Sequence, residues 1–218
     1  MEDVLHWYGA ELPPNQVRLC FDERPCQPLD EVLVPLAAKP GQVAKQDYEY
    51  ERKGTACVLA AYDIDQGQRQ VEVRPHRTKL DYAEFMHRVV FEWYPQAEKI
   101  HLIQDNLNTH RMGCFYERYD AKIAFQMQQK LVFHYTPLHA SWLNMIELEF
   151  AALTKQCLDR RIGNLEMLEK EVLAWAVKRN EDRTRIKWLF DKERAQGKFK
   201  RHYLSLNPRN NTIFNSNN

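Results

Sequence analysis

Three acidic residues lie at positions from which their carboxylates could meet in one site of the folded chain. Asp22 and Asp105 each follow a short apolar run, and Glu147 lies near the start of an amphipathic segment that follows a third run. Three carboxylates in one crevice would raise one another's pKa values, and bound cations would remove that penalty. Carboxylate oxygens suit Mg²⁺ or Mn²⁺, and two such ions about 3.5–4 Å apart can activate a water and stabilise the leaving oxygen of a phosphodiester. The pattern therefore predicts metal-dependent phosphoryl transfer on nucleic acid.

Each acid also has a plainer interpretation when it is taken alone. An aspartate after a strand is commonly a turn or helix-cap residue, which would account for Asp22 and Asp105. Glu147 could be an ordinary exposed acid on a helix. Glu149 competes with it, because residues two positions apart on a helix point about 200° apart, so only one of the two can face the metals.

The elements that would position these acids alternate along the chain. Apolar and alternating patterns predict five strands, at 17–21, 55–64, 69–74, 99–104 and 131–135. Helical spacing predicts helices at 80–94 after a Thr78 cap, at about 113–129, from near Glu147 to about 158, and at about 165–179. This order predicts an α/β fold, a mixed sheet with helices on both faces, in which ligands collect at the carboxyl ends of strands.

The first and fourth of these strands decide whether the acids can meet. Pro25 is expected to stop the first strand, which would leave Asp22 at its C-terminal end. Asp105 follows the fourth strand directly. If the two strands are neighbours, both aspartates project from the same edge of the sheet, and Glu147 can complete the triangle from its helix.

The composition limits the class of protein. The 218 residues are 44% hydrophobic and 28% charged, so the chain can bury a core. Five cysteines without a C-x-x-C motif argue against disulfides and structural zinc, and we expect neither a signal peptide nor a membrane span. The net charge is +1, but residues 178–202 carry ten basic and four acidic residues, a surplus of +6. Such a surplus suits either a polyanionic partner or a plain solvated surface.

Three sequence blocks resemble those of a known family. VRLCFDERPCQPL, HLIQDNLNTH and HYTPLHASWLNMIELEF resemble the catalytic blocks of bacterial insertion-sequence transposases of the mariner-like group, within the superfamily of DDE transposases and retroviral integrases. The resemblance covers about 1–203 and implies a ribonuclease H-like mixed five-stranded sheet flanked by helices. One departure is the 41 residues between Asp105 and Glu147, more than is usual for the group, with the excess expected at 111–130.

The resemblance also implies roles for particular residues. Asp22, Asp105 and Glu147 would be catalytic and would bind two Mg²⁺ or Mn²⁺ ions, with Asp22 bridging them and Glu147 preferred to Glu149. Asn144 would share the helix face of Glu147, three residues before it. Residues expected to support the metals or to contact DNA are Asn106, His110, Asn144, Arg183, Arg185, Lys187, Lys198, Lys200 and Arg201. The last six belong to the basic segment, which could bind phosphates without sequence preference.

The implied activity is DNA transposition, with cleavage at a transposon end followed by strand transfer into target DNA. Double-stranded DNA is the implied partner, with a possible homodimer. A possible separate helix-turn-helix protein is implied because no such module precedes the first catalytic block. The expected location is the bacterial cytoplasm, on the nucleoid. Two alternatives stay open: a nuclease of the same fold without strand transfer, and a catalytically silent DNA-binding remnant.

The expected organisation has four segments. Residues 1–16 form an N-terminal lead-in or linker, 17–180 the ribonuclease H-like catalytic domain, 181–205 a basic C-terminal extension and 206–218 a disordered tail. Over 183–203 we predict a strand or hairpin followed by a short helix.

Overall fold

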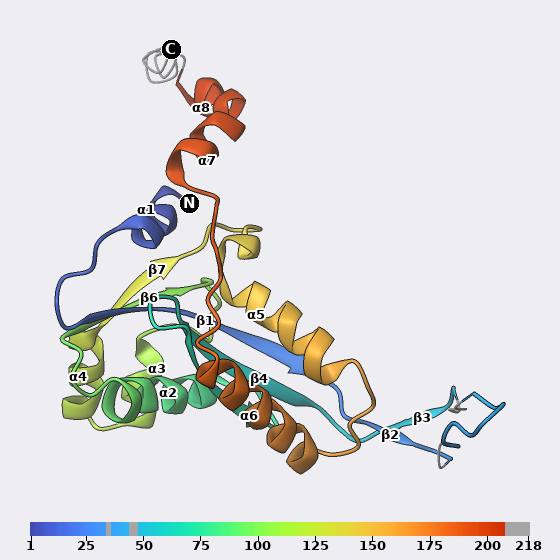
Figure 1. The fold of residues 1–218 in the computed structure, drawn as a ribbon. Coiled ribbons are helices and arrows are strands. Elements are labelled where there is room, and N and C mark those ends of the chain that lie inside the picture. Colours follow the sequence, from blue (N-terminus) through green and yellow to red (C-terminus); the bar gives the residue numbers. More distant parts are fainter. Residues whose placement is uncertain (34–35, 44–47, 208–218) are drawn as a thin grey trace.

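A five-stranded mixed sheet forms the centre of the molecule in the computed structural model, which describes residues 1–33, 36–43 and 48–207 (Figure 1). The strand order is β5-β4-β1-β6-β7, in which β5, β4 and β1 are antiparallel while β1, β6 and β7 are parallel. These strands are β1 (Gln16–Cys26), β4 (Ala56–Asp63), β5 (Gln68–Arg74), β6 (Lys99–Gln104) and β7 (Leu131–Tyr135). The predicted mixed sheet of five strands is confirmed, and the fourth and fifth predicted strands have the bounds expected for them.

Helices cover both faces of this sheet, as predicted. They are α1 (Glu2–Gly9), α2 (Lys79–Arg88), α3 (Gly113–Arg118), α4 (Ala121–Lys130), α5 (Ile146–Leu153), α6 (Leu165–Glu181), α7 (Lys192–Lys198) and α8 (Lys200–Leu206). Short turns of other helix types are η1 (Val89–Trp93), η2 (Ser141–Leu143) and η3 (Thr154–Leu158). Thr78 caps α2 through a reciprocal capping box with Asp81, which confirms the predicted start of that helix. None of the helices in the described part of the chain is long and apolar enough to cross a membrane.

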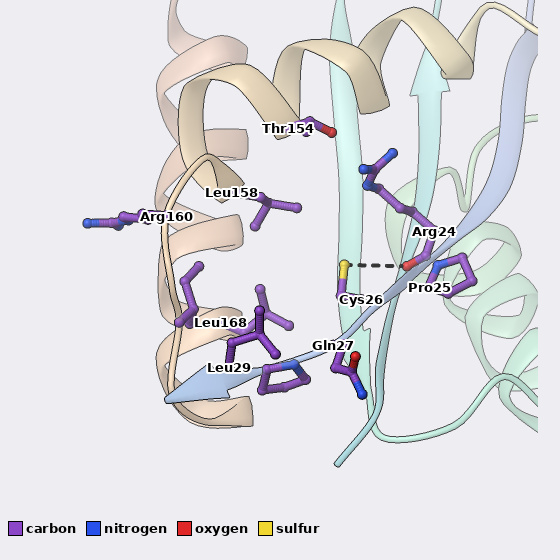
Figure 2. Close-up of a pocket in the computed structure, with 11 residues that line it drawn as sticks. Arg24, Pro25, Cys26, Gln27, Leu29, Thr154, Leu158, Arg160 and Leu168 are labelled. Carbon is purple, nitrogen blue, oxygen red and sulfur yellow. Dashed lines mark hydrogen bonds between the residues drawn. The ribbon is translucent and has the colours of Figure 1, made fainter. Parts of the chain in front are cut away.

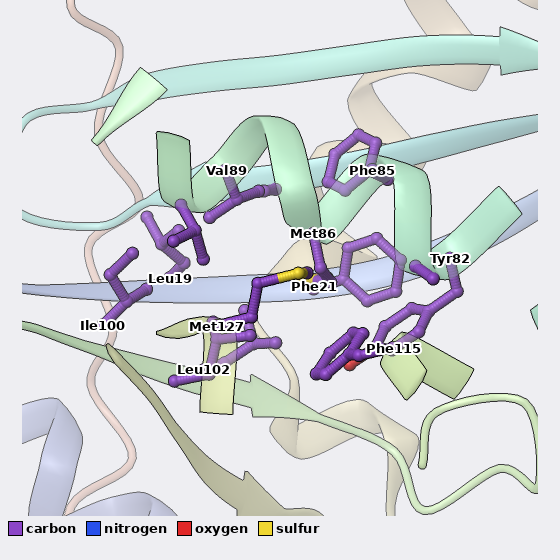
Figure 3. Packing of buried hydrophobic residues seen from close by; sticks show 14 of the residues in the cluster. Leu19, Phe21, Tyr82, Phe85, Met86, Val89, Ile100, Leu102, Phe115 and Met127 are labelled. Carbon is purple, nitrogen blue, oxygen red and sulfur yellow. The ribbon is translucent and has the colours of Figure 1, made fainter. Parts of the chain in front are cut away.

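Alternation along the strands divides the core into two layers. Leu19 and Phe21 of β1 pack with α2, α3 and α4 in one cluster (Figure 3). Cys20, one residue from each of them, packs instead with α5 and α6 in the other cluster. Because successive strand residues point to opposite faces, Asp22 lies on the α5 and α6 side and Glu23 on the α2 side.

β1 is longer than predicted. The expectation that Pro25 ends this strand is wrong, since Pro25 stays in register with Cys57 of β4 and the strand continues to Cys26. The parallel partner β6 pairs with β1 only up to Cys20. Beyond that point β1 has a neighbour on one side alone, where a proline is tolerated because its missing N–H need not serve a second partner.

Two other segments differ from their predictions. The predicted helix over 113–129 is two helices, because the Asp120 side chain accepts hydrogen bonds from two backbone N–H groups and starts α4 afresh. Residues 183–190 form no strand; their backbone is instead held by side chains, with the Ile186 N–H donating to the Tyr62 hydroxyl. Helices α7 and α8 follow, so a short helical part is present as expected.

The chain on either side of the catalytic blocks is also structured. Val4 of α1 is fully buried against the sheet, and Tyr8 donates a hydrogen bond to the Leu143 carbonyl oxygen. The excursion between β1 and β4 forms a small antiparallel sheet of β2 (Leu29–Glu31) and β3 (Tyr50–Arg52), which projects from the main sheet (Figure 1). The tail predicted at 206–218 falls, from 208 onward, outside the described residues.

Candidate active site

Asp22 and Asp105 lie level with each other on neighbouring strands. The parallel register pairs Cys20 with Ile103, so Asp22 and Asp105 both follow two residues later. Asp105 stands directly after β6, as predicted, whereas Asp22 lies within β1 opposite Ala60 of β4. The prediction that the two strands are neighbours is therefore confirmed. Asp22, however, lies just beyond the part of β1 that pairs with β6, and not at the end of its strand.

Glu147 is brought to these aspartates by a turn fixed to β1. Asn144 is buried, and its Nδ2 donates a 2.8 Å hydrogen bond to the Phe21 carbonyl oxygen, next to Asp22. The Asn144 carbonyl oxygen in turn accepts from the Glu147 N–H at 3.1 Å. Asn144 has extended dihedrals and precedes α5, so the expectation that it shares a helix face with Glu147 is wrong. It instead attaches the start of the helix to the strand that carries Asp22.

The pKa of Asp22 reflects its burial and the charges of the other two acids. Burial raises the pKa of Asp22 to about 7, a hydrogen bond from the Glu23 N–H lowers it, and the charges of Asp105 and Glu147 raise it further. Both of those carboxylates therefore lie near enough to act on Asp22, which is the effect expected when acids share one crevice. A partly buried group of three carboxylates suits hard divalent cations.

The carboxylate oxygens fit a metal by their chemistry, but the described residues do not hold them as a ready cluster. In the part of the chain that the structure describes, no group of three His, Cys, Asp or Glu side chains is arranged to hold a metal ion. A cation would offset both the burial and the neighbouring negative charges that raise the pKa of Asp22.

His110 connects Asp105 to the opposite face of the sheet. Its Nδ1 lies 2.7 Å from Asp105 Oδ1, and its Nε2 lies 3.3 Å from Glu23 Oε1. Burial lowers the pKa of His110, but hydrogen bonds to Asp105 and Glu23 outweigh it and raise the pKa to about 9. A protonated imidazole thus holds Asp105 on one side and the buried Glu23 on the other.

Similarity to known proteins agrees with this arrangement. The family described as DDE superfamily endonuclease matches residues 17–169, a span that contains all three acids. The chain belongs to the DDE superfamily endonucleases. No curated protein matches the chain.

Solved structures similar to this DDE endonuclease include two of the Mos1 mariner transposase. A crystal structure of the Mos1 mariner paired-end complex with Mn has a TM-score of 0.55 at 15% identity, covering 83% of this chain and 53% of that one. A second Mos1 structure, a paired-end complex with the left transposon end, has a TM-score of 0.36 at 12% identity, covering 84% of this chain and 59% of that one. The chain thus spans little more than half the length of the solved structures that it matches. The first similarity agrees with the ribonuclease H-like fold predicted for this DDE endonuclease.

Glu149 of the DDE endonuclease points away from the acids into a buried ion-pair network. Its carboxylate accepts two hydrogen bonds from Arg69, at 2.6 and 2.9 Å, and two from Arg179, at 3.1 and 2.9 Å. Burial raises the pKa of Glu149, but the two guanidinium groups lower it more, so the group stays ionised. This network joins α5 to β5 and α6, whereas the charge of Glu147 raises the pKa of Asp22.

The other predicted site residues are spread more widely. Asn106 is exposed in the loop after β6, whereas His110 is in the site. The predicted cations of the basic segment lie along 183–190 and on α7 and α8: Arg183, Arg185, Lys187, Lys198, Lys200 and Arg201. His110 thus contacts Asp105 and Asn144 bonds next to Asp22, whereas the basic residues belong to other segments of the chain.

Sequence reasoning did not identify three residues that shape this site. Glu23 and Arg24 adjoin Asp22, and the alternation of β1 could have placed them on opposite faces of the sheet. Arg69 has no comparable signal, because its partner Glu149 lies 80 residues away along the chain.

The raised pKa of Asp22 predicts a pH-dependent stability in the absence of metal. Between its ordinary value of 3.8 and about 7, the folded chain holds a proton that the unfolded chain has lost, so folding becomes weaker as pH rises. Asp22→Asn should therefore stabilise the metal-free protein above pH 7, by up to about 4 kcal/mol. Thermal unfolding in EDTA across this pH range measures the difference between the two proteins. A difference that does not change with pH would contradict the proposed environment of Asp22.

The His110 contacts predict a structural effect. His110→Phe should lower the free energy of unfolding by about 2 kcal/mol, because it leaves the buried Glu23 carboxylate without its cation. Urea unfolding near neutral pH measures this change. Adding Glu23→Gln should restore part of the loss, and a double variant no more stable than His110→Phe would show that the Glu23 contact is not the cause.

Proposed function

We propose that this DDE endonuclease is the catalytic domain of a transposase that cleaves DNA at transposon ends and joins the freed 3′-hydroxyl to target DNA. The observation that carries the proposal is the convergence of Asp22, Asp105 and Glu147, seen in the effect of the latter two on the pKa of Asp22. The similar fold of the Mos1 mariner paired-end complex supports this choice among reactions of DDE endonucleases.

Two divalent cations, Mg²⁺ or Mn²⁺, would be held by the carboxylates of Asp22, Asp105 and Glu147. The manganese named for the Mos1 complex supports such a cofactor. When bound, the ions would supply activation of a water or hydroxyl and stabilisation of the leaving oxygen. His110 would keep the Asp105 carboxylate oriented, and the Asn144 bond to β1 would hold Glu147 over the strand.

Double-stranded DNA is the proposed substrate, in the cytoplasm of a bacterium. We assign catalysis to residues 17–180 and salt-dependent phosphate binding to the basic extension at 181–205, whose cations are mostly exposed. A homodimer and a separate helix-turn-helix protein are the proposed partners for pairing and recognising transposon ends. The paired-end assembly named for Mos1 supports the pairing.

Incubation with DNA that carries the ends flanking the gene, with Mg²⁺ or with EDTA, tests this function. Metal-dependent nicks together with joined products are expected. Nicks without joined products would favour a nuclease of the same fold. DNA binding without any metal-dependent cleavage would favour a catalytically silent remnant.

A further inference from the structure

A pocket lies between the last part of β1, which also carries Asp22, and η3, which follows α5 directly. Its volume is about 240 Å³, and its walls include Arg24, Pro25, Thr154, Leu158, Arg160 and Leu168. Figure 2 shows the Arg24 side chain rising from β1 toward Thr154. The pocket therefore combines a cationic side chain with largely apolar walls.

The pocket lies farther along the strand that carries Asp22 and along the helix that carries Glu147. Arg24 follows Asp22 by two residues, so the two share a face of β1 and stand about 7 Å apart along it. Thr154 follows Glu147 by seven residues, which is two helical turns and about 10 Å along the same helix face. A DNA strand that passes the acids can thus reach the pocket directly.

Arg24 carries an unsatisfied donor within the described part of the protein. Its Nε is buried and has no hydrogen-bond acceptor, and its guanidinium takes part in none of the ion pairs there. The arginines of the folded core behave differently: Arg69 and Arg179 each contact Glu149 through two nitrogens. A buried donor without an acceptor is costly, so an external group that accepts from Arg24 would be favoured in this pocket.

We infer that this pocket binds a backbone phosphate of the DNA strand next to the phosphodiester held by the acids. The guanidinium offers a fork of donors that matches a phosphate, and Pro25, Leu158 and Leu168 give apolar contact for the adjoining sugar. Arg160 adds positive charge to the pocket, although it also pairs with Glu171. The identity of the ligand as DNA rests on the proposed function.

The test compares DNA affinity between variants over a range of salt concentrations. Arg24→Gln should weaken binding of a short fluorescent DNA duplex about tenfold at low salt and reduce the slope of log Kd against log salt by about 0.9, the value of one phosphate contact. Arg24→Lys should keep the slope, because it keeps the charge. Lys122→Ala is the matched control, since Lys122 is an exposed cation of α4 on the other face of the sheet. Thermal unfolding establishes that each variant is folded.

The outcomes separate this inference from the proposed function. An Arg24→Gln protein with the wild-type affinity and slope would overturn the phosphate site, even if the wild type cleaves DNA. Weaker binding with a smaller slope would support the site, even if the wild type cleaves nothing and the proposed function fails. A loss equal to that of Lys122→Ala would also overturn it, because the effect would then be one of net charge.

Discussion

Asp22→Asn is expected to lower the rate of DNA strand cleavage by about a thousandfold or more, while the protein stays folded. Asp22 is the acid whose pKa both Asp105 and Glu147 raise, and we propose that its carboxylate would hold the cations. An amide oxygen carries no charge and binds Mg²⁺ more weakly, and loss of this electrostatic stabilisation acts directly on the transition state. A gel assay of cleavage of labelled end-containing DNA under single-turnover conditions measures the rate.

Two further variants sharpen this result. Glu147→Gln should lose activity to a similar degree, since Glu147 supplies the third carboxylate from α5. Glu98→Gln changes an exposed acid that precedes β6, and it should cleave at the wild-type rate. Asp22→Asn should also lose most of the increase in melting temperature that Mg²⁺ gives the wild type. Full cleavage by Asp22→Asn would refute the assignment of this acid to the metals.

Glu149→Gln is expected to lower the free energy of unfolding by about 3–5 kcal/mol, although Glu147, two residues earlier, can be replaced with little loss of stability. The Glu149 carboxylate is 2% exposed and balances Arg69, which is 1% exposed. An amide would leave the Arg69 charge buried without an anion, and the contact between α5 and β5 would weaken. Equilibrium unfolding in urea measures both variants.

The two glutamate variants should differ in opposite ways in activity and in stability. Glu147→Gln should give an inactive protein that unfolds like the wild type, and Glu149→Gln should give an unstable protein that still cleaves at temperatures where it is folded. Removing the positive charge as well, in the double variant Arg69→Met with Glu149→Leu, should recover much of the stability, because apolar residues can replace a buried ion pair. If Glu147→Gln proves the more damaging to stability, the orientation of α5 differs from the one described.

The parts of the fold that depend on local patterns agree with the sequence. The strands at 99–104 and 131–135 have the predicted bounds, because continuous apolar runs of that length are typical of buried strands and the surrounding polar residues end them. Thr78 and Asp81 cap a helix by contacts three residues apart, which a sequence can specify without knowing the rest of the fold. The position of Asp105 after its strand follows from the same kind of local pattern.

Other features were decided by residues that are distant in the chain. Pro25 was expected to end a strand, and it does not, because β6 pairs only with the first part of β1 and leaves that side of Pro25 without a partner. The segment after α6 was expected to form a strand, but Tyr62 and Arg69 take the hydrogen bonds that a strand would have used. Such outcomes depend on which surfaces meet, and neither propensity nor periodicity contains that information.

The sequence by itself determined the three acids, the order of the elements that carry them and the expectation of divalent metals. The DDE endonuclease family and the mixed sheet confirm the predicted family and fold. Only the tertiary structure decided that Asn144 holds the start of α5 to β1 and that Arg24 lines a pocket with an unsatisfied Nε. The physical reason is that the environment of a side chain is the sum of its contacts in space, and in this protein the decisive contacts join residues 80 or more positions apart.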